Sequence, residues 1–216
     1  MKGLILAGLA ATVLGVGMIG CGGSGGGLGL GANAYTVPFI AKSDVQYIDA
    51  MVPHHLMAID MAQMVLDRGS DTQIRAIAQA IKDAQGPEIT ALKSVRQTLT
   101  GSDVIPASPN DPYLDKMMMD MEAMSGSELD MMFLKSMIGH HSEAISIAER
   151  ALDNLSRTDM KANAEAVISD QAREIGEMQA LRSTTRFRMT NRLIRTSLQQ
   201  RGQQGVIPCG HWGGGV

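Results

Sequence analysis

Two pairs of adjacent histidines carry the most evident chemistry in this sequence. They account for four of the five histidines in the chain: His54, His55, His140 and His141. The pairs lie in two related segments, DVQYIDAMVPHHLMAIDMA at 44–62 and DMMFLKSMIGHHSEAISIA at 130–148. Both histidines keep one offset of 86 residues (140 minus 54, 141 minus 55). Because imidazole is the commonest metal ligand among side chains, the duplicated pairs predict a metal site.

Each pair is preceded by a methionine and by a residue that weakens a helix. Met51 lies three residues before His54 and shares a helical face with it, and Met137 repeats this position in the second segment. Pro53 and Gly139 stand directly before the pairs, and both are unfavourable inside a helix. Since thioether sulfur is a soft ligand that selects Cu(I), we expect both methionines to join the histidines in a shaped site.

A Gln-x-x-Glu motif follows each histidine pair and is also duplicated at the offset of 86 (174 minus 88). Its members are Gln85, Glu88, Gln171 and Glu174. His55 precedes a turn at Gly69 by 14 residues (69 minus 55), and the same distance beyond the turn ends near residue 83. An antiparallel hairpin therefore sets His55 level with the first motif, and His141 level with the second. Each hairpin is predicted to bring imidazole, amide and carboxylate groups together.

A methionine stripe precedes the second copy. Met117, Met121 and Met124 follow the i, i+4, i+7 spacing of one helical face, in a chain that has 17 methionines. Such a stripe can simply fill a core. Because it lies directly before a histidine pair, it can also form a surface that handles Cu(I). Both interpretations stay open at this stage.

Helical periodicity runs through both copies. We expect long helices over 43–69, 70–100, 127–154 and 156–181, and a short Met-rich helix over 113–124. Three capping pairs are predicted: Ser43 with Gln46, Ser70 with Gln73, and Ser156 with Asp159. Ser127 is expected to open the second copy. Gly86-Pro87 divides the first Gln-x-x-Glu motif and is expected to kink its helix.

The repeats predict an all-α domain, an antiparallel four-helix bundle built from two tandem hairpins with pseudo-twofold symmetry. The domain spans 43–181, with repeats at 43–100 and 127–181 and a linker with the Met-rich helix at 101–126. Two independent hairpin modules are the alternative. Each of them would bury too little apolar surface to be stable alone, so the bundle is favoured.

The N-terminal end is typical of an exported lipoprotein. Residues 1–21 combine Lys2, an apolar run and Cys21, and residues 22–42 begin as a Gly-rich tether. Cys21 is the predicted lipidation site, which would anchor an extracytoplasmic domain to the bacterial cell membrane. An uncleaved signal anchor is the alternative. In either case the domain is exported.

The C-terminal segment, 182–216, is basic and is expected to be partly disordered. Its six arginines are Arg182, Arg186, Arg188, Arg192, Arg195 and Arg201, and the segment contains no acidic residue. A solvated helix end is favoured over a segment lying on anionic lipid. The chain as a whole has a net charge of −3, which gives no electrostatic reason to expect a nucleic-acid partner.

The doubled His-His motif, with Asp, an aromatic residue, Met, Ala-Ile and Gln-x-x-Glu-Ile around it, resembles a known family over about 43–181. This is the ferritin-like domain-of-unknown-function family that includes periplasmic CopM-type copper-binding proteins. The resemblance implies a four-helix bundle outside the cytoplasm that binds copper, or silver, through His and Met. Lys135 and Gly139 depart from the first copy, which has Asp49 and Pro53.

Three functions compete on this reading. The first is a Cu(I)- or Ag(I)-binding protein for copper buffering, delivery or resistance, with a possible transfer partner or homo-oligomer. The second is a ferritin-like di-metal oxidase, which would need Glu-x-x-His motifs that the two copies lack. The third is a structural bundle whose His and Glu form a core network. Copper is favoured over iron or zinc, and a binding protein over an enzyme.

Overall fold

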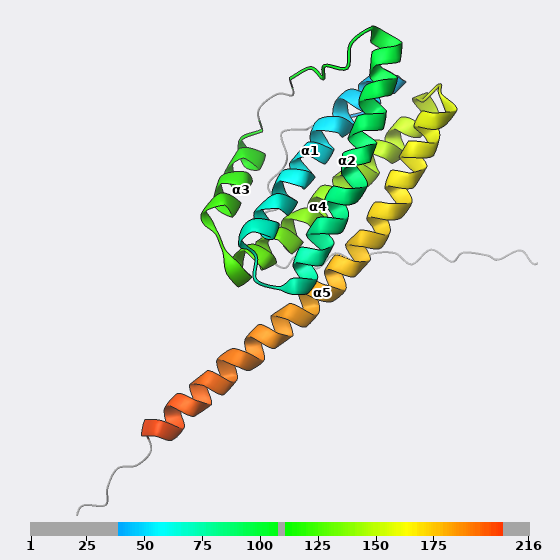
Figure 1. The fold of residues 1–216 in the computed structure, drawn as a ribbon. Coiled ribbons are helices and arrows are strands. Elements are labelled where there is room, and N and C mark those ends of the chain that lie inside the picture. Colours follow the sequence, from blue (N-terminus) through cyan, green and yellow to red (C-terminus); the bar gives the residue numbers. More distant parts are fainter. Residues whose placement is uncertain (1–38, 108–110, 205–216) are drawn as a thin grey trace, which may run out of the picture. The chain divides into compact units, whose positions relative to one another are not determined.

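The computed structural model describes residues 39–107 and 111–204, and this part of the chain is all α-helical (Figure 1). Its elements are α1 (Asp44–Arg68), α2 (Thr72–Thr100), α3 (Pro112–Ala123), α4 (Gly126–Ala151), a short 3-10 helix (Leu152–Asn154) and α5 (Thr158–Gln204). The predicted all-α fold is confirmed. None of these helices is long and apolar enough to cross a membrane. The predicted lipoprotein signal, Cys21 and most of the tether lie outside the described residues.

The four long helices pack as two hairpins side by side. α1 packs against α2 and α4, and α5 packs against α4 and α2, so that each helix has two neighbours (Figure 1). Neighbours run antiparallel, because the start of α1 lies at the end of α4 and the start of α4 lies at the end of α1. This is the neighbour pattern of a four-helix bundle. The shorter α3 lies against α1 and α4.

Two aspartates join the hairpins across the pseudo-twofold axis. Asp130, at the start of α4, accepts hydrogen bonds from the Ser70 amide (3.0 Å), the Ser70 hydroxyl (2.7 Å) and the Asp71 amide (2.9 Å). Its counterpart Asp44 accepts from the amide of Ser156 at 3.0 Å. Each repeat therefore satisfies the backbone donors at the interhelical turn of the other repeat.

These contacts displace two of the predicted caps. Ser70 does not cap α2, because Asp130 takes its amide and hydroxyl. Asp71 caps α2 instead and accepts from the Gln73 and Ile74 amides. Ser156 likewise donates to Asp44, and α5 begins two residues later.

At α4 the N-cap is Ser125 rather than Ser127. The Ser43 cap is confirmed, since its side chain accepts from the Gln46 amide, although the Gln46 side chain reaches back to Lys42.

Gly69 ends α1 as predicted, but for a steric reason. Its φ of −71° is open to any residue. A Cβ at Gly69 would lie 2.6 Å from Asp130 Oδ1 and 2.6 Å from the Val65 carbonyl oxygen. The close approach of the Asp130 carboxylate to this turn therefore requires glycine.

Gly69→Ala is expected to lower the free energy of unfolding by about 1–3 kcal/mol, because backbone and carboxylate atoms must shift to admit the methyl group. Urea denaturation measures the loss. Gly176→Ala is the matched control, since nothing lies within 4 Å of a Cβ there, and it should stabilise α5 by about 0.5–1 kcal/mol. Equal effects of the two substitutions would show that the contact with Asp130 is unimportant.

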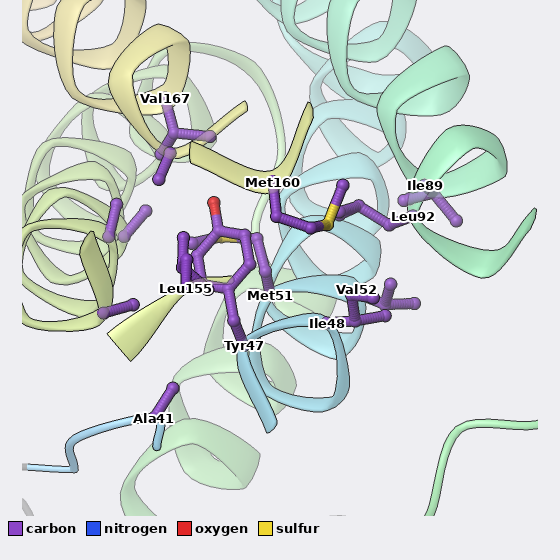
Figure 2. Close-up of a cluster of buried hydrophobic side chains, with 14 residues drawn as sticks. Ala41, Tyr47, Ile48, Met51, Val52, Ile89, Leu92, Leu155, Met160 and Val167 are labelled. Carbon is purple, nitrogen blue, oxygen red and sulfur yellow. The ribbon is translucent and has the colours of Figure 1, made fainter. Parts of the chain in front are cut away.

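The core follows the predicted helical stripes and divides into two clusters. The first surrounds Tyr47, whose ring lies among Met51, Leu155 and Met160, with its hydroxyl donating to Asn163 Oδ1 at 2.9 Å (Figure 2). The second is rich in methionine and includes Met137 and Phe133. The symmetry extends to the packing, since each of Met51 and Met137 shares a cluster with alanines of the other repeat.

Two sequence differences between the repeats can be located in the structure. Asp49 of the first repeat forms an ion pair with Arg96 at 2.6 Å. The corresponding residues of the second repeat, Lys135 and Arg182, are both cationic and line a cavity of about 280 Å³. The helix α2 continues through Gly86-Pro87.

The helix α5 runs past the predicted boundary at 181 without a break. Residues 182–204 form its C-terminal part, as expected for a solvated helix end, and Phe187 and Leu193 are exposed there. The predicted basic tail is therefore helical as far as Gln204. Residues 205–216 lie outside the described part of the chain.

Candidate metal centre

The two histidine pairs meet at the centre of the α1–α4 interface. The ring centroids of His54 and His140 are 3.7 Å apart, with an angle of 36° between the ring planes. His55 is 6.5 Å from His54, and His141 is 6.3 Å from His140, by the same measure. All four imidazoles are therefore close together, with His54 and His140 in the middle.

The outer two histidines are each held by a glutamate of the neighbouring helix. His55 Nε2 lies 2.8 Å from Glu88 Oε2, and His141 Nε2 lies 2.8 Å from Glu174 Oε2. This is the juxtaposition predicted from the hairpin arithmetic, and it is the same in both repeats. Since a carboxylate only accepts hydrogen bonds, Nε2 is the donor in each pair, and in the neutral imidazole Nδ1 then keeps its lone pair. A carboxylate that orients an imidazole in this way is a regular feature of metal-binding histidines.

The other six ring nitrogens of the cluster lack hydrogen-bond partners among the described residues. Six ring nitrogens are buried and unpartnered: both nitrogens of His54, both of His140, Nδ1 of His55 and Nδ1 of His141. An unsatisfied buried polar atom costs about 1–3 kcal/mol, so six of them in one cluster require an explanation. A bound metal ion would use the one lone pair that each neutral imidazole offers, four in all, whereas the remaining nitrogens of His54 and His140 carry hydrogen.

Burial keeps the central histidines neutral. Loss of solvation lowers the pKa of His54 to about 3, and the neighbouring His55 and His141 add to this shift. The pKa of His140 is also well below its usual range, chiefly because of burial and then because of His54. The backbone of His54 raises the pKa of His140 slightly and so opposes this lowering only in part. It does not form a hydrogen bond with the His140 ring. Neutral imidazole is the form that binds metals.

The stability of the chelator-treated protein is expected to fall below pH 6.5. An unfolded histidine takes up a proton near pH 6.5, whereas folded His54 stays neutral down to a pKa of about 3. The unfolded state then binds more protons, so the free energy of unfolding drops as the pH decreases through this window. Each such histidine contributes a slope of up to about 1.4 kcal/mol per pH unit.

Urea titrations between pH 7.5 and 5.0 measure this slope above the range in which most carboxylates protonate. The variant His54→Leu/His140→Leu is the control, and its slope should be clearly smaller. Equal slopes for both proteins would contradict the neutral, buried state of the two histidines.

The two Gln-x-x-Glu motifs face each other between α2 and α5. They enclose a cavity of about 110 Å³ lined by Ala84, Gln85, Glu88, Val167, Asp170, Gln171, Arg173 and Glu174. The side-chain oxygens Oε1 of Gln85 and Gln171 are buried and have no hydrogen-bond partner in the described part of the chain. Arg173 lies 3.6 Å from Glu174 at this place.

The predicted methionine ligands take different positions. Met51 and Met137 are fully buried and pack in the two core clusters beside the histidine level. Met117 and Met121 of α3 also pack in the second cluster, and Met124 is partly buried against it. Core packing accounts for the three methionines of the stripe, so their role in copper binding stays a prediction.

Glu143 is a neighbour of the site that the sequence interpretation did not include. Its Oε2 lies 4.0 Å from His54 Nε2, across the interface between α4 and α1. Burial raises the pKa of Glu143. The spacing His140-x-x-Glu143 could have indicated it, because residues three apart share a helical face. Its counterpart in the first repeat is Met57, so this contact is not duplicated.

The residues present fit a soft metal ion in chemistry. Neutral imidazole nitrogens with free lone pairs suit copper and silver, and the two glutamates orient their rings. The described residues contain no group of three or more His, Cys, Asp or Glu side chains already arranged around one point. Since His54 and His140 contact each other through their rings, coordination requires a side-chain rotation in at least one of them.

Comparison with known proteins agrees with the fold. A family model described as "Domain of unknown function (DUF305)" matches residues 44–182. An uncharacterized protein of Acanthamoeba polyphaga mimivirus, L153, is 38% identical over 52 residues, which are 24% of this chain and 34% of that protein. The chain thus matches about a third of the length of this curated relative.

Solved structures of similar fold include CopM and a protein from Streptomyces coelicolor. CopM in its Cu(I)-bound form is 29% identical with a TM-score of 0.57, covering 65% of this chain and 96% of CopM. Its Cu(II)-bound form gives 26% and 0.58, with 66% and 97% covered. The Streptomyces protein, a DUF305 protein inferred to be secreted, is 20% identical with a TM-score of 0.60, covering 67% and 95%.

Proposed function

This chain belongs to the DUF305 family, and on that premise we propose that it binds Cu(I) or Ag(I) through its buried histidine cluster. The observation that carries the proposal is the set of six buried, unpartnered ring nitrogens on four neighbouring histidines. Structures of the similar protein CopM in copper- and silver-bound forms support a soft metal. The role would be copper buffering, delivery or resistance.

Each ligand group has a distinct part in this proposal. His54 and His140 supply nitrogens from the centre of the α1–α4 interface. His55 and His141 supply Nδ1, while Glu88 and Glu174 hold their rings and balance the charge of the cation. Met51 and Met137 precede the histidine pairs by three residues on the same helices, and the softness of their thioethers would favour Cu(I) over Zn(II) or Fe(II).

We further propose that the protein acts outside the cytoplasm as a lipoprotein. The supporting features are the apolar N-terminal run that ends in Cys21 and the Gly-rich tether after it. The Streptomyces family member inferred to be secreted is consistent with export. Metabolic labelling with a radioactive fatty acid, compared between the wild type and Cys21→Ala, tests the anchor. Labelling of the variant at the wild-type level would rule out Cys21 as the lipidated residue.

One titration tests the metal assignment. The full chain is titrated with Cu(I), Ag(I), Zn(II) and Fe(II), and the measurement is repeated after all four histidines are changed to alanine. We expect Cu(I) and Ag(I) to bind most tightly, and the fourfold variant to lose at least about 4 kcal/mol of binding free energy, a thousandfold in Kd. Unchanged Cu(I) affinity would refute the site. Preferential Fe(II) binding with oxygen consumption would instead indicate a di-metal oxidase.

A further inference from the structure

The histidine cluster is buried, so a metal ion must pass between helices to reach it. His55 and His141 are fully buried, and His140 is 7% exposed. The rings lie between α1 and α4 on one side and are covered by the glutamates of α2 and α5 on the other. One of these two faces must open toward solvent.

The cavity between α2 and α5 has the lining that a cation would meet first. Its walls carry two carboxylates and two amides from the duplicated Gln-x-x-Glu motifs, together with Asp170 and Arg173. The Arg173 guanidinium lies 3.9 Å from Asp170 and 3.6 Å from Glu174, so its charge is balanced by carboxylates. The amide oxygens of Gln85 and Gln171 are buried, unpartnered and part of this lining. Oxygen atoms without a donor are unfavourable in an apolar core, but they suit a passing cation or the water that accompanies it.

Glu88 and Glu174 connect this cavity with the histidines. Each glutamate lines the cavity and at the same time places Oε2 2.8 Å from a buried histidine Nε2. The Glu88 side chain keeps 29% of its exposure, so the lining also reaches the surface. The two glutamates thus join the cavity lining to the imidazoles, and Glu88 also joins it to solvent.

The packing of this face also favours passage. α2 and α5 make the weakest contact of the four neighbouring helix pairs, whereas α1 and α4 are packed closely. Pro87 lies between the two cavity residues Gln85 and Glu88 and cannot donate the usual backbone bond, which weakens α2 there. A Cβ at Gly86 would meet nothing within 4 Å. The helix α2 is therefore held mainly by α1, and little packing closes the cavity on the α5 side.

The opposite face offers a poorer route. Its carboxylate, Glu143, approaches His54 only to 4.0 Å, beyond hydrogen-bond distance. The counterpart of Glu143 in the first repeat is Met57. This face therefore offers a cation one carboxylate, whereas the duplicated motifs of the α2–α5 cavity offer two carboxylates and two amides.

From these observations we propose that the α2–α5 cavity is the port through which soft metal cations reach the buried histidines, with Glu88 and Glu174 passing the ion inward. The inference rests on the proposed function and adds the route by which the metal ion reaches the histidines. The cation binds the carboxylate oxygens weakly in the port, and the imidazole nitrogens hold it more strongly inside. Bulk at the rim should then change the rates of uptake and release without changing the equilibrium affinity.

The test places a tryptophan at the rim. Ala84 is exposed and lines the cavity, whereas Ala162 is exposed on α5 outside the lining. Cu(I) is supplied to the full chain from a colorimetric chelator, and stopped-flow absorbance records uptake and release. We expect Ala84→Trp to slow both rates about tenfold at constant Kd, and Ala162→Trp to leave them unchanged. Thermal melts of the chelator-treated proteins confirm that both variants fold.

A second variant tests the lining itself. Gln85→Leu/Gln171→Leu removes the two unpartnered oxygens, so it should raise the melting temperature of the chelator-treated protein by about 3 °C while slowing uptake. Wild-type rates in both the rim and the lining variants would refute the port. So would a weaker Kd caused only by faster release, because the substitutions would then have disturbed the site. If no variant and no wild-type protein takes up Cu(I), the proposed function fails and the port with it.

Discussion

Replacing His54 and His140 together by leucine is expected to weaken Cu(I) binding at least about a thousandfold and, at the same time, to stabilise the chelator-treated protein. The two rings are in contact at a centroid distance of 3.7 Å, and their four nitrogens are buried without partners. Leucine fills a similar volume and has no polar atom to desolvate. The free energy of unfolding should therefore rise by about 2 kcal/mol or more at pH 7.5.

Competition with a Cu(I) chelator gives the affinity, and urea denaturation gives the stability. His211→Leu is the matched control, because this fifth histidine belongs to neither pair, and both quantities should stay at the wild-type value. Loss of affinity together with loss of stability would show that contact between His54 and His140 is needed for folding. Wild-type affinity of the double variant would remove these two histidines from the metal site.

Asp130→Ala is expected to be among the most destabilising substitutions in the chain, at about 4 kcal/mol. The side chain is 1% exposed and accepts hydrogen bonds from three donors of the other hairpin. Its removal leaves the Ser70 and Asp71 donors without their charged acceptor, and hydrogen bonds to charged groups are worth about 1.5–3 kcal/mol each. Asp44→Ala should cost about 2 kcal/mol, because within the described part of the chain Asp44 accepts only from the Ser156 and Arg157 amides.

Urea denaturation of both variants gives this order, and Asp67→Ala provides the control. Among the residues that the structure describes, Asp67 accepts only from the Gln63 side chain on the surface of its own helix, so its loss should cost less than about 0.5 kcal/mol. Equal losses at positions 44 and 130 would contradict the view that the number of donors sets the cost. A loss at Asp130 as small as that at Asp67 would show that the two hairpins hold together without this contact.

The duplicated sequence allowed much of the site to be predicted. The offset of 86 residues between His54 and His140 and between Glu88 and Glu174 identified two equivalent hairpins. Hairpin geometry then placed His55 beside Glu88, because the rise per residue is constant along a helix. The cap at Ser70 was predicted wrongly, since a local rule cannot include Asp130, which is 60 residues away in the chain.

The repeated aspartates show the same limit. Asp44 and Asp130 were visible as an equivalent pair, but nothing near them in sequence indicates which donors they accept. Likewise, Gly69 is recognisable as a helix end, whereas its steric reason depends on the position of a carboxylate from the other repeat. In each case the partner lies across the pseudo-twofold axis.

By itself, then, the sequence determined the helices, their pairing within each hairpin and the residue types of the histidine cluster, because these depend on periodicity and on distance along the chain. Only the tertiary structure decided that the His54 ring contacts the His140 ring, and that the two Gln-x-x-Glu motifs enclose a cavity. These contacts join separate hairpins, and they depend on how each helix is rotated and how closely it packs. Helical periodicity defines the buried face of a helix, but it leaves open which atoms meet there.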